Sequence, residues 1–269
     1  MAKESSYDLM TKRIIAELES GKIPWKKPWA GCEAMNYFRR IPYRGINRIL
    51  LPGGEYMTEK ELKYKKGSKI KEGALPHWVA YYRMYEREDP NNPGLKEKVF
   101  FLKHYQVYSL KDIEGVQSKI EQKEHNPIEA AEELLKSFKN LPKITHKDIN
   151  KALYVASEDI INIPEMKYFE SAEAYYNTLF KLIIHSTGHE SRLKRMKDVT
   201  NIEEYSKEEL IGQFGQQILC GMAGMDNVVE NPEPEYLQGW VKVFSSDDRT
   251  AIQCACRAQN IIDYLTGTK

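Results

Sequence analysis

The feature that most constrains this chain is a pair of segments rich in Val, Phe and Tyr on either side of a turn-forming run. The segments read HWVAYYRMY over 77–85 and KVFFLKHYQVYSL over 98–110, and DPNNPG lies between them. β-Branched and aromatic residues favour extended strands, whereas Pro, Asn and Gly favour turns. The pattern therefore predicts a β-hairpin in the first half of the chain.

Helix signals flank this hairpin and dominate the second half. An apolar stripe predicts a helix from Tyr7 to Ser20, and Thr58 with Glu61 forms a capping box that opens a short helix. Beyond the hairpin the sequence predicts helices over 171–187, 206–223 and 247–265, opened by Ser171, by Ser206 with Glu209 and by Ser246, and a short β-pair or irregular edge from 153–155 and 160–163. The fold class expected is α+β.

The chain is long enough for two cores that fold without disulfides. We expect an N-terminal α+β domain at 1–117 and a charged helical connector at 118–147, which Pro127 and Pro142 interrupt. A mostly helical domain with a small β element should follow at 148–269.

Neither export nor membrane insertion is indicated. The N-terminus lacks a signal-peptide pattern, and no apolar run approaches the ~20 residues that a membrane span needs. Cys32, Cys220, Cys254 and Cys256 form no CxxC pair, so they are expected to be reduced thiols. The sequence thus predicts a cytoplasmic protein without a membrane partner.

Positive charge is concentrated in the first half. The net charge is only +1, but residues 1–117 hold 22 Lys and Arg against 15 Asp and Glu, whereas the remainder holds 18 against 24. The halves therefore carry +7 and −6. A basic half favours a polyanionic partner, and the acidic half indicates that this partner is not bound along the whole chain.

Aromatic side chains are interleaved with these cations. Single-stranded nucleic acid is bound by a positive groove together with rings on which bases stack, whereas signatures of duplex readers are missing from the sequence. The residues that we expect to bind single-stranded DNA are Trp25, Lys26, Lys27, Trp29, Phe38, Arg39, Arg40, Tyr43, Arg44, Asn47, Arg48, Lys69 and Lys71. The alternative is that the rings are core residues and that the lysines form a solvated face.

A histidine pair in the second half has the spacing of a zinc-peptidase motif. His185 and His189 lie at i and i+4 in HSTGH, but Ser186 stands at the first position between them and cannot act as a general base near neutral pH. Gly188 is expected to end the helix, so the imidazoles need not converge. Glu208 and Glu209 are further candidate ligands, yet ordinary hydrogen-bonding histidines are the simpler interpretation.

Several separated motifs together resemble the ArdC-like antirestriction proteins of mobile genetic elements. They are RIIAELESGKIPWKKPW, PYRGIN, YVASEDIINIPEMKYFESAEAYYNTLF, HSTGH and YSKEELIGQFGQQILC, in this order along nearly the whole chain. The resemblance implies a domain that binds single-stranded DNA followed by a zincin-like metallopeptidase domain.

The same resemblance indicates that the catalytic motif is degenerate. The family's helix reads like TLFHELVHWTGH, and its alignment with TLFKLIIHSTGH places Lys181 at the first zinc histidine and Leu182 at the catalytic glutamate. We therefore expect no catalytic residue and no cofactor, and we expect Lys181 to pair with Glu208 or Glu209. Zinc bound by His185, His189, Glu208 and Glu209 is the alternative.

The function expected is that of a DNA-binding accessory protein of a mobile element, with a pseudoenzyme domain. The resemblance also leaves a host restriction or defence protein open as a partner. Two rival interpretations are an active metallopeptidase with a non-standard site and a protein-interaction module that acts through the acidic half.

Overall fold

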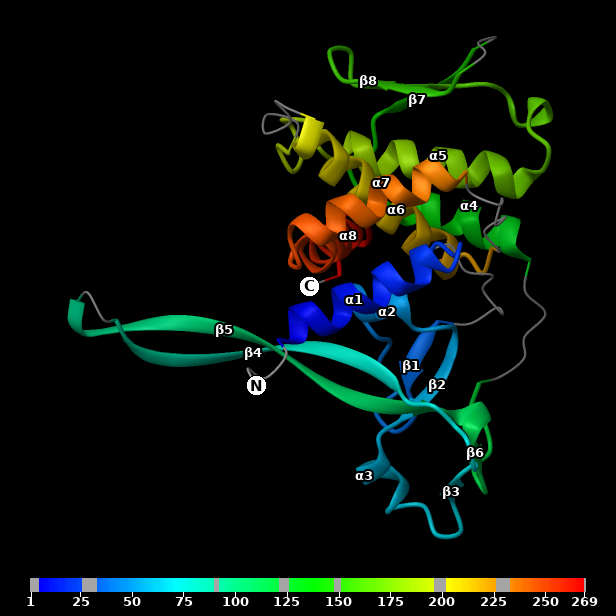
Figure 1. Ribbon diagram of the computed structural model, residues 1–269. Coiled ribbons are helices and arrows are strands. Elements are labelled where there is room, and N and C mark those ends of the chain that lie inside the picture. The colour runs from blue at the N-terminus through cyan, green and yellow to red at the C-terminus, as the bar shows by residue number, and fades with distance from the viewer. Residues whose placement is uncertain are drawn as a thin grey trace.

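The structure, a computed structural model, describes residues 5–25, 33–89, 92–120, 126–147, 151–195, 202–225 and 233–268. Strands of the first half form a sheet region, and helices of the second half pack together on one side of it (Figure 1). The predicted α+β class is confirmed.

The predicted hairpin is present and is longer than expected. β4 (His77–Asp89) pairs antiparallel with β5 (Asn92–Ser109), and the inner end of β5 pairs with β2 (Gly54–Met57). β2 lies parallel to β1 (Ala34–Asn36), so the strand order is β1-β2-β5-β4. The outer part of the hairpin projects from the body as a two-stranded ribbon (Figure 1).

Short elements complete the first half. They are α1 (Ser6–Glu19), α2 (Ile46–Leu50), α3 (Glu59–Leu62), a 3-10 turn at Leu110–Asp112, and the paired strands β3 (Lys69–Ile70) and β6 (Ile113–Glu114). The capping box that the sequence predicts for α3 is confirmed. Thr58 Oγ1 accepts a hydrogen bond from Glu61 N, and the Glu61 carboxylate accepts one from Thr58 N.

A three-stranded sheet opens the second half. β8 (Leu153–Val155) pairs antiparallel with β9 (Ile160–Ile163), which confirms the predicted β-pair. β9 also pairs in parallel with β7 (Lys143–His146). The segment predicted as a helical connector therefore contributes one helix, α4 (Pro127–Ser137), and one strand of this sheet.

Four helices form the main body: α5 (Ala172–Ser186), α6 (Ile202–Met222), α7 (Pro234–Ser246) and α8 (Thr250–Thr266), with a 3-10 turn at Met166–Tyr168 before α5. The predicted start at Ser206 is wrong, because α6 begins four residues earlier and Ser206 lies inside it.

None of the described helices is long and apolar enough to cross a membrane.

The predicted start at Ser246 is also wrong, because this residue ends α7. The turn into α8 is made by Asp247, whose carboxylate accepts hydrogen bonds from Arg249 N and Thr250 Oγ1, both at 3.0 Å. α7 is not predicted from the sequence, although Pro234 stands at its N-terminus.

The three described cysteines lie on α6 and α8 and are free thiols. Burial raises the pKa of Cys254 to about 12 and also raises the pKa of Cys220. Both thiols are therefore protonated and function as small apolar core residues. Cys32 lies outside the described residues.

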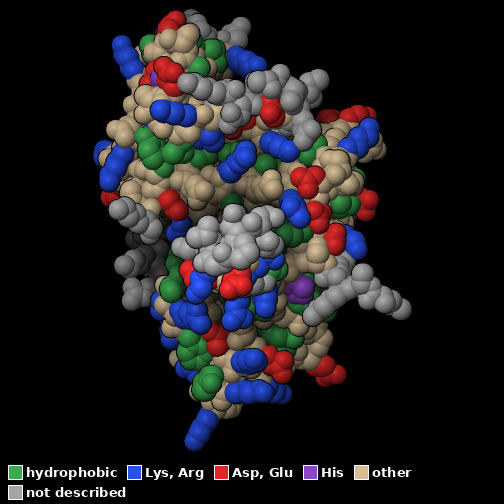
Figure 2. All heavy atoms as spheres, turned by 90° about the vertical axis from the view of Figure 1, so that its left-hand side faces the viewer, with side chains coloured by type: hydrophobic (Ala, Val, Ile, Leu, Met, Phe, Trp, Pro, Cys, Tyr) green, Lys and Arg blue, Asp and Glu red, His purple; other side chains and the backbone are tan. Residues whose placement is uncertain are grey.

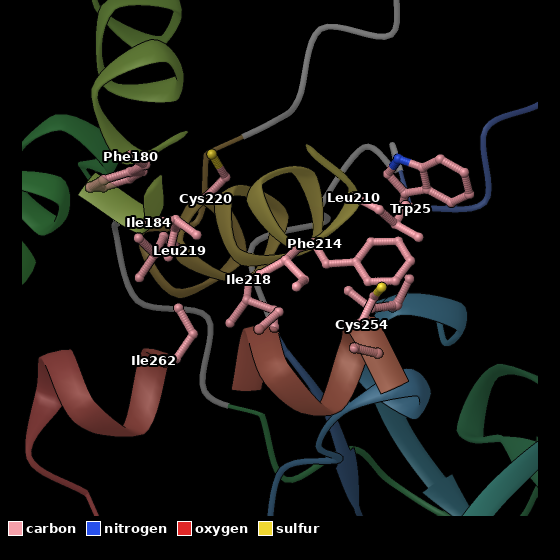
Figure 3. Packing of buried hydrophobic residues seen from close by; sticks show 14 of the residues in the cluster. Trp25, Phe180, Ile184, Leu210, Phe214, Ile218, Leu219, Cys220, Cys254 and Ile262 are labelled. Atoms are coloured by element: carbon pink, nitrogen blue, oxygen red, sulfur yellow. The ribbon is translucent and has the colours of Figure 1, made fainter. Parts of the chain in front are cut away.

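Trp25 belongs to the core cluster that joins the two halves and lies beside Phe214 of α6 (Figure 3). Its side chain is 1% exposed and meets Phe214 of α6 edge to face at a centroid distance of 5.4 Å. Trp240 and Phe244 of α7 make similar edge contacts at 5.8 and 5.9 Å. Aromatic pairs in this geometry add to the stabilisation from burial, so Trp25 fixes the N-terminal segment to the helical layer.

Replacement of Trp25 by Ala should lower the free energy of unfolding by ~3–5 kcal/mol, because it empties a closely packed aromatic site. Urea unfolding followed by far-UV circular dichroism measures this loss. The matched control is Tyr64→Ala, which removes a ring that is 82% exposed and should change stability by less than ~0.5 kcal/mol. Equal effects of the two changes would contradict the core assignment of Trp25.

Candidate functional site

The residues that the sequence aligns with the metallopeptidase motif, and the two candidate glutamates, lie between two helices that pack closely. Lys181 and His185 are one turn apart on α5, and Glu208 and Glu209 lie on the facing side of α6. Gly212 permits this contact, because a Cβ there would be 2.6 Å from two ring atoms of His185. The imidazole is therefore held directly against the α6 backbone.

Lys181 pairs with the second of the two glutamates. Its Nζ donates to Glu209 Oε1 at 2.5 Å, which agrees with the predicted pairing. Gln213 Nε2 donates to the same oxygen at 3.1 Å. The side-chain oxygen Oε1 of Gln213 in turn accepts hydrogen bonds from Trp25 Nε1 at 2.9 Å and from the Tyr236 hydroxyl at 3.0 Å. The ammonium group thus belongs to a polar network that extends into the core.

Glu208 is neutralised by a residue that the sequence analysis missed. Arg195 donates to both of its carboxylate oxygens, at 2.9 and 3.3 Å, and His185 Nδ1 lies 3.6 Å from one of them. Burial pushes the pKa of Glu208 up, but hydrogen bonds from His185 and Arg195 outweigh it and hold the pKa below its usual value. Glu208 is only 8% exposed, so this ion pair is largely buried.

His189 does not join this group. α5 ends at Ser186, and His189 lies in the following turn, where its Nδ1 is 2.8 Å from Ser191 Oγ. Arg192 fixes this turn by donating to Ser186 O at 2.9 Å and to both carboxylate oxygens of Asp159. The Arg192 hydrogen bonds hold the pKa of Asp159 at about 2. The helix end therefore separates the two histidines, as Gly188 predicts.

The residues present do not fit a divalent cation. Lys181 places an ammonium group against Glu209, and a guanidinium already binds Glu208. Leu182 packs against the apolar core and offers no ligand atom. In the part of the chain that the structure describes, no three His, Cys, Asp or Glu side chains form a group able to hold a metal ion.

Replacement of Arg195 by Met should destabilise the protein by ~3–5 kcal/mol at pH 7, because it leaves a buried carboxylate without its cation. In the parent protein the ion pair stabilises the fold above the unfolded pKa of 4.5, and this stability is lost as pH falls through the lower folded pKa. In the variant, Arg195 no longer offsets the effect of burial on Glu208. The pKa of Glu208 therefore rises, and its carboxylate binds a proton more readily.

The stability difference between parent and R195M should therefore be largest at neutral pH and shrink below pH 4.5, which urea unfolding at several pH values measures. The matched control is Arg195→Met combined with Glu208→Leu, which removes both charges and should recover most of the loss. A pH-independent difference would disprove the ion-pair explanation.

The predicted nucleic-acid residues are dispersed in the structure, and several hold the fold together. Arg40 pairs with Glu55, Arg44 with Asp263 of α8, and the buried Arg48 with Glu33. The described residues that serve in these ion pairs or in the core are Trp25, Arg40, Tyr43, Arg44 and Arg48. Asn47 exchanges hydrogen bonds with the backbone of Ala80 at 2.6 and 2.7 Å. Their charged and polar groups therefore interact with other residues of this chain.

Four other predicted residues that the structure describes are more accessible than these. Arg39, Lys69 and Lys71 are exposed, and Phe38 is half-buried. Lys69 lies 3.2 Å from Glu114 in an exposed ion pair, which contributes little to stability. Tyr43 is buried and forms part of the wall of a cavity of about 350 Å³ beside Arg39. Lys26, Lys27 and Trp29 lie outside the described residues.

Two family models match consecutive parts of the chain. Residues 4–108 match the N-terminal domain of the anti-restriction factor ArdC. Residues 129–257 match a zincin-like metallopeptidase. The first match contains β4, nearly all of β5 and the residues predicted to bind DNA, and the second contains Lys181, His185, Glu208 and Glu209.

Curated relatives extend beyond the region that is shared with this chain. Two DNA primases TraC from Escherichia coli are 28% and 26% identical over 98% of the chain. The chain spans only 20% and 27% of their lengths.

Solved structures match over almost the full length of both chains. The metal-free crystal structure of the antirestriction protein ArdC from plasmid R388 is 28% identical and superposes with a TM-score of 0.78, covering 97% of this chain and 96% of that one. The Mn(II)-bound structure of ArdC is 27% identical with a TM-score of 0.76, and 98% of each chain is covered.

Proposed function

This chain is an ArdC-like protein, and from that premise we propose that it binds single-stranded DNA through its N-terminal domain and that its zincin-like domain is catalytically inactive. Binding of entering DNA strands by such a protein fits an antirestriction role for a mobile element. The observation that carries the DNA-binding proposal is the surplus of positive charge, +7, in residues 1–117.

The position of the exposed cations supports the proposal. In Figure 2, which faces the side from which the ribbon projects, Lys and Arg side chains are numerous over the lower half of the molecule, with some Asp and Glu among them. In Figure 1 this lower half is the N-terminal domain. A charge surplus on one domain attracts a polyanion to that domain and leaves the acidic helical domain outside the contact.

Affinity for a fluorescein-labelled dT20 strand should fall steeply with salt, because bound phosphates release counterions. For contacts with four phosphates the fall is ~100-fold between 50 and 300 mM salt. Fluorescence anisotropy at both concentrations measures this change. A 20-base-pair duplex used as a competitor should bind more weakly than dT20. An affinity for dT20 that is unchanged across this range would refute binding through phosphates.

Catalytic inactivity is supported by the chemistry at the α5–α6 contact. A zincin needs three protein ligands and a general base beside the metal-bound water. Here Lys181 is a cation at a ligand position, Leu182 cannot accept a proton, and Glu208 and Glu209 each contact a basic side chain. These side chains provide neither the ligand set nor the base.

Purified protein should therefore retain no stoichiometric zinc or manganese after dialysis and should not cleave casein. Lys181→His combined with Leu182→Glu restores a His, Glu and His arrangement on α5, so the double variant should gain one equivalent of zinc. Metal content by plasma mass spectrometry and a casein assay with and without chelator measure these outcomes.

The matched control is Lys167→His with Tyr168→Glu, which introduces the same residue types at an exposed turn outside α5. It should bind no more zinc than the parent. Stoichiometric metal in the parent, or chelator-sensitive cleavage by it, would overturn the pseudoenzyme proposal.

A further inference from the structure

One face of the β4–β5 ribbon pairs each exposed ring with a cation on the neighbouring strand. Tyr81 lies directly opposite Lys103, and Phe101 lies directly opposite Arg83. Directly opposed residues share a face of a two-stranded sheet. We call the surface formed by Tyr81, Arg83, Phe101 and Lys103 the ribbon face.

The rings of the ribbon face are accessible. Tyr81 is 41% exposed and Phe101 is 37% exposed, and the two cations are also exposed. In the register of the hairpin the rings are diagonal neighbours, which places their Cα atoms ~7–8 Å apart. Two flat apolar surfaces therefore stand side by side, and each has a positive charge next to it.

The opposite side of the ribbon is the side that contacts the body. His104 Nδ1 lies 2.8 Å from Ser6 Oγ of α1, and the hydroxyls of Tyr82 and Tyr7 are 3.4 Å apart. Because successive side chains alternate between the faces of a strand, Tyr82 and His104 point away from the ribbon face. α1 therefore supports the ribbon from behind.

The ribbon face continues inward to the cavity beside Arg39. Tyr105 follows Lys103 on the same face and meets Tyr81 edge to face at a centroid distance of 5.6 Å. Tyr105 also lines the 350 Å³ cavity together with Arg39 and Tyr43. Tyr105 thus links the ribbon face to a cavity that is lined by Arg39, by the ring of Tyr43 and also by Glu61.

We propose that the ribbon face is the base-stacking platform for single-stranded DNA, with bases on Tyr81 and Phe101 and with Lys103 and Arg83 on the adjacent phosphates. This inference rests on the proposed DNA binding and assigns its location. Every base has an aromatic face, so stacking on exposed rings binds strands without regard to sequence. The ring and cation pairs match the two chemical components of a single strand.

Charge favours a nucleic acid over a peptide at this surface. β4 is an edge strand, so a peptide could add to it through backbone hydrogen bonds. Such a partner would be recognised by the strand edge and would not need a cation opposite each ring. The ribbon face therefore fits a strand that carries both flat bases and negative charge.

Tyr81→Ala and Phe101→Ala should each weaken binding of labelled dT20 by about 5- to 150-fold in fluorescence anisotropy with the full-length protein, because each removes one stacked base. Tyr81→Phe keeps the ring and should bind like the parent. A 20-residue abasic strand offers phosphates without bases, so the parent and both Ala variants should bind it equally.

Arg83→Ala combined with Lys103→Ala should act differently from loss of the rings. Loss of two phosphate contacts should reduce the salt slope of log affinity by ~1.4 for a single strand. The abasic strand should be affected as strongly as dT20. The proposed role of the ribbon face requires both results: a loss of affinity that depends on bases when a ring is removed, and a smaller salt slope when the two cations are removed.

Tyr168→Ala and Tyr205→Ala are matched controls, because both rings are exposed and lie in the zincin-like half. They should leave dT20 binding unchanged, and urea unfolding checks that all variants are folded. If the parent binds dT20 and the ribbon variants bind it equally well, this inference fails and the proposed function stands. If the parent does not bind dT20, both fail.

Discussion

The close approach of α5 and α6 determines the geometry of the zincin-like half. Two glycines on α6 permit it: Gly212 faces His185, and a Cβ at Gly215 would be 2.8 Å from the Ile184 side chain. Helices that touch through glycine have little freedom to slide or rotate, because any added atom would overlap the neighbour. This register places Lys181 opposite Glu209 and His185 opposite Glu208.

Two carboxylates held this close to a helix interface must be neutralised. Lys181 and Arg195 together supply two positive charges against Glu208 and Glu209, the same total charge as a divalent cation. The contributions are unequal, because the Lys181 pair is about one-third exposed and the Arg195 pair is largely buried. Removal of Arg195 therefore matters more for stability than removal of Lys181.

The fold was more predictable from the sequence than the site. The hairpin has a strong local signal in its aromatic strands and its turn, and Thr58 with Glu61 correctly marks α3. The same capping pattern at Ser206 is misleading, because a cap stabilises a helix by only ~1 kcal/mol, whereas α6 packs against both α5 and α8 and begins at Ile202.

Within the site, the sequence predicts the pairing of Lys181 with a neighbouring glutamate but not the role of Arg195. The motif on α5 identifies Lys181 as a cation beside the two glutamates, and so predicts its ion pair. Arg195, in contrast, reaches Glu208 from a loop that has no sequence motif. Trp25 shows a related limit, because a ring in a lysine-rich segment has the same sequence pattern whether it is exposed or buried. Tertiary contacts alone distinguish these cases.

The arginines of the first half show why a count of positive charge overstates a binding surface. Arg40, Arg44 and Arg48 are each paired with a carboxylate, and the partner of Arg44 lies on α8 in the acidic half. Part of the charge asymmetry along the sequence therefore stabilises the contact between the halves. The proposed attraction for DNA therefore depends on cations that the fold leaves at the surface, and on the ribbon face Arg83 and Lys103 lie beside exposed rings.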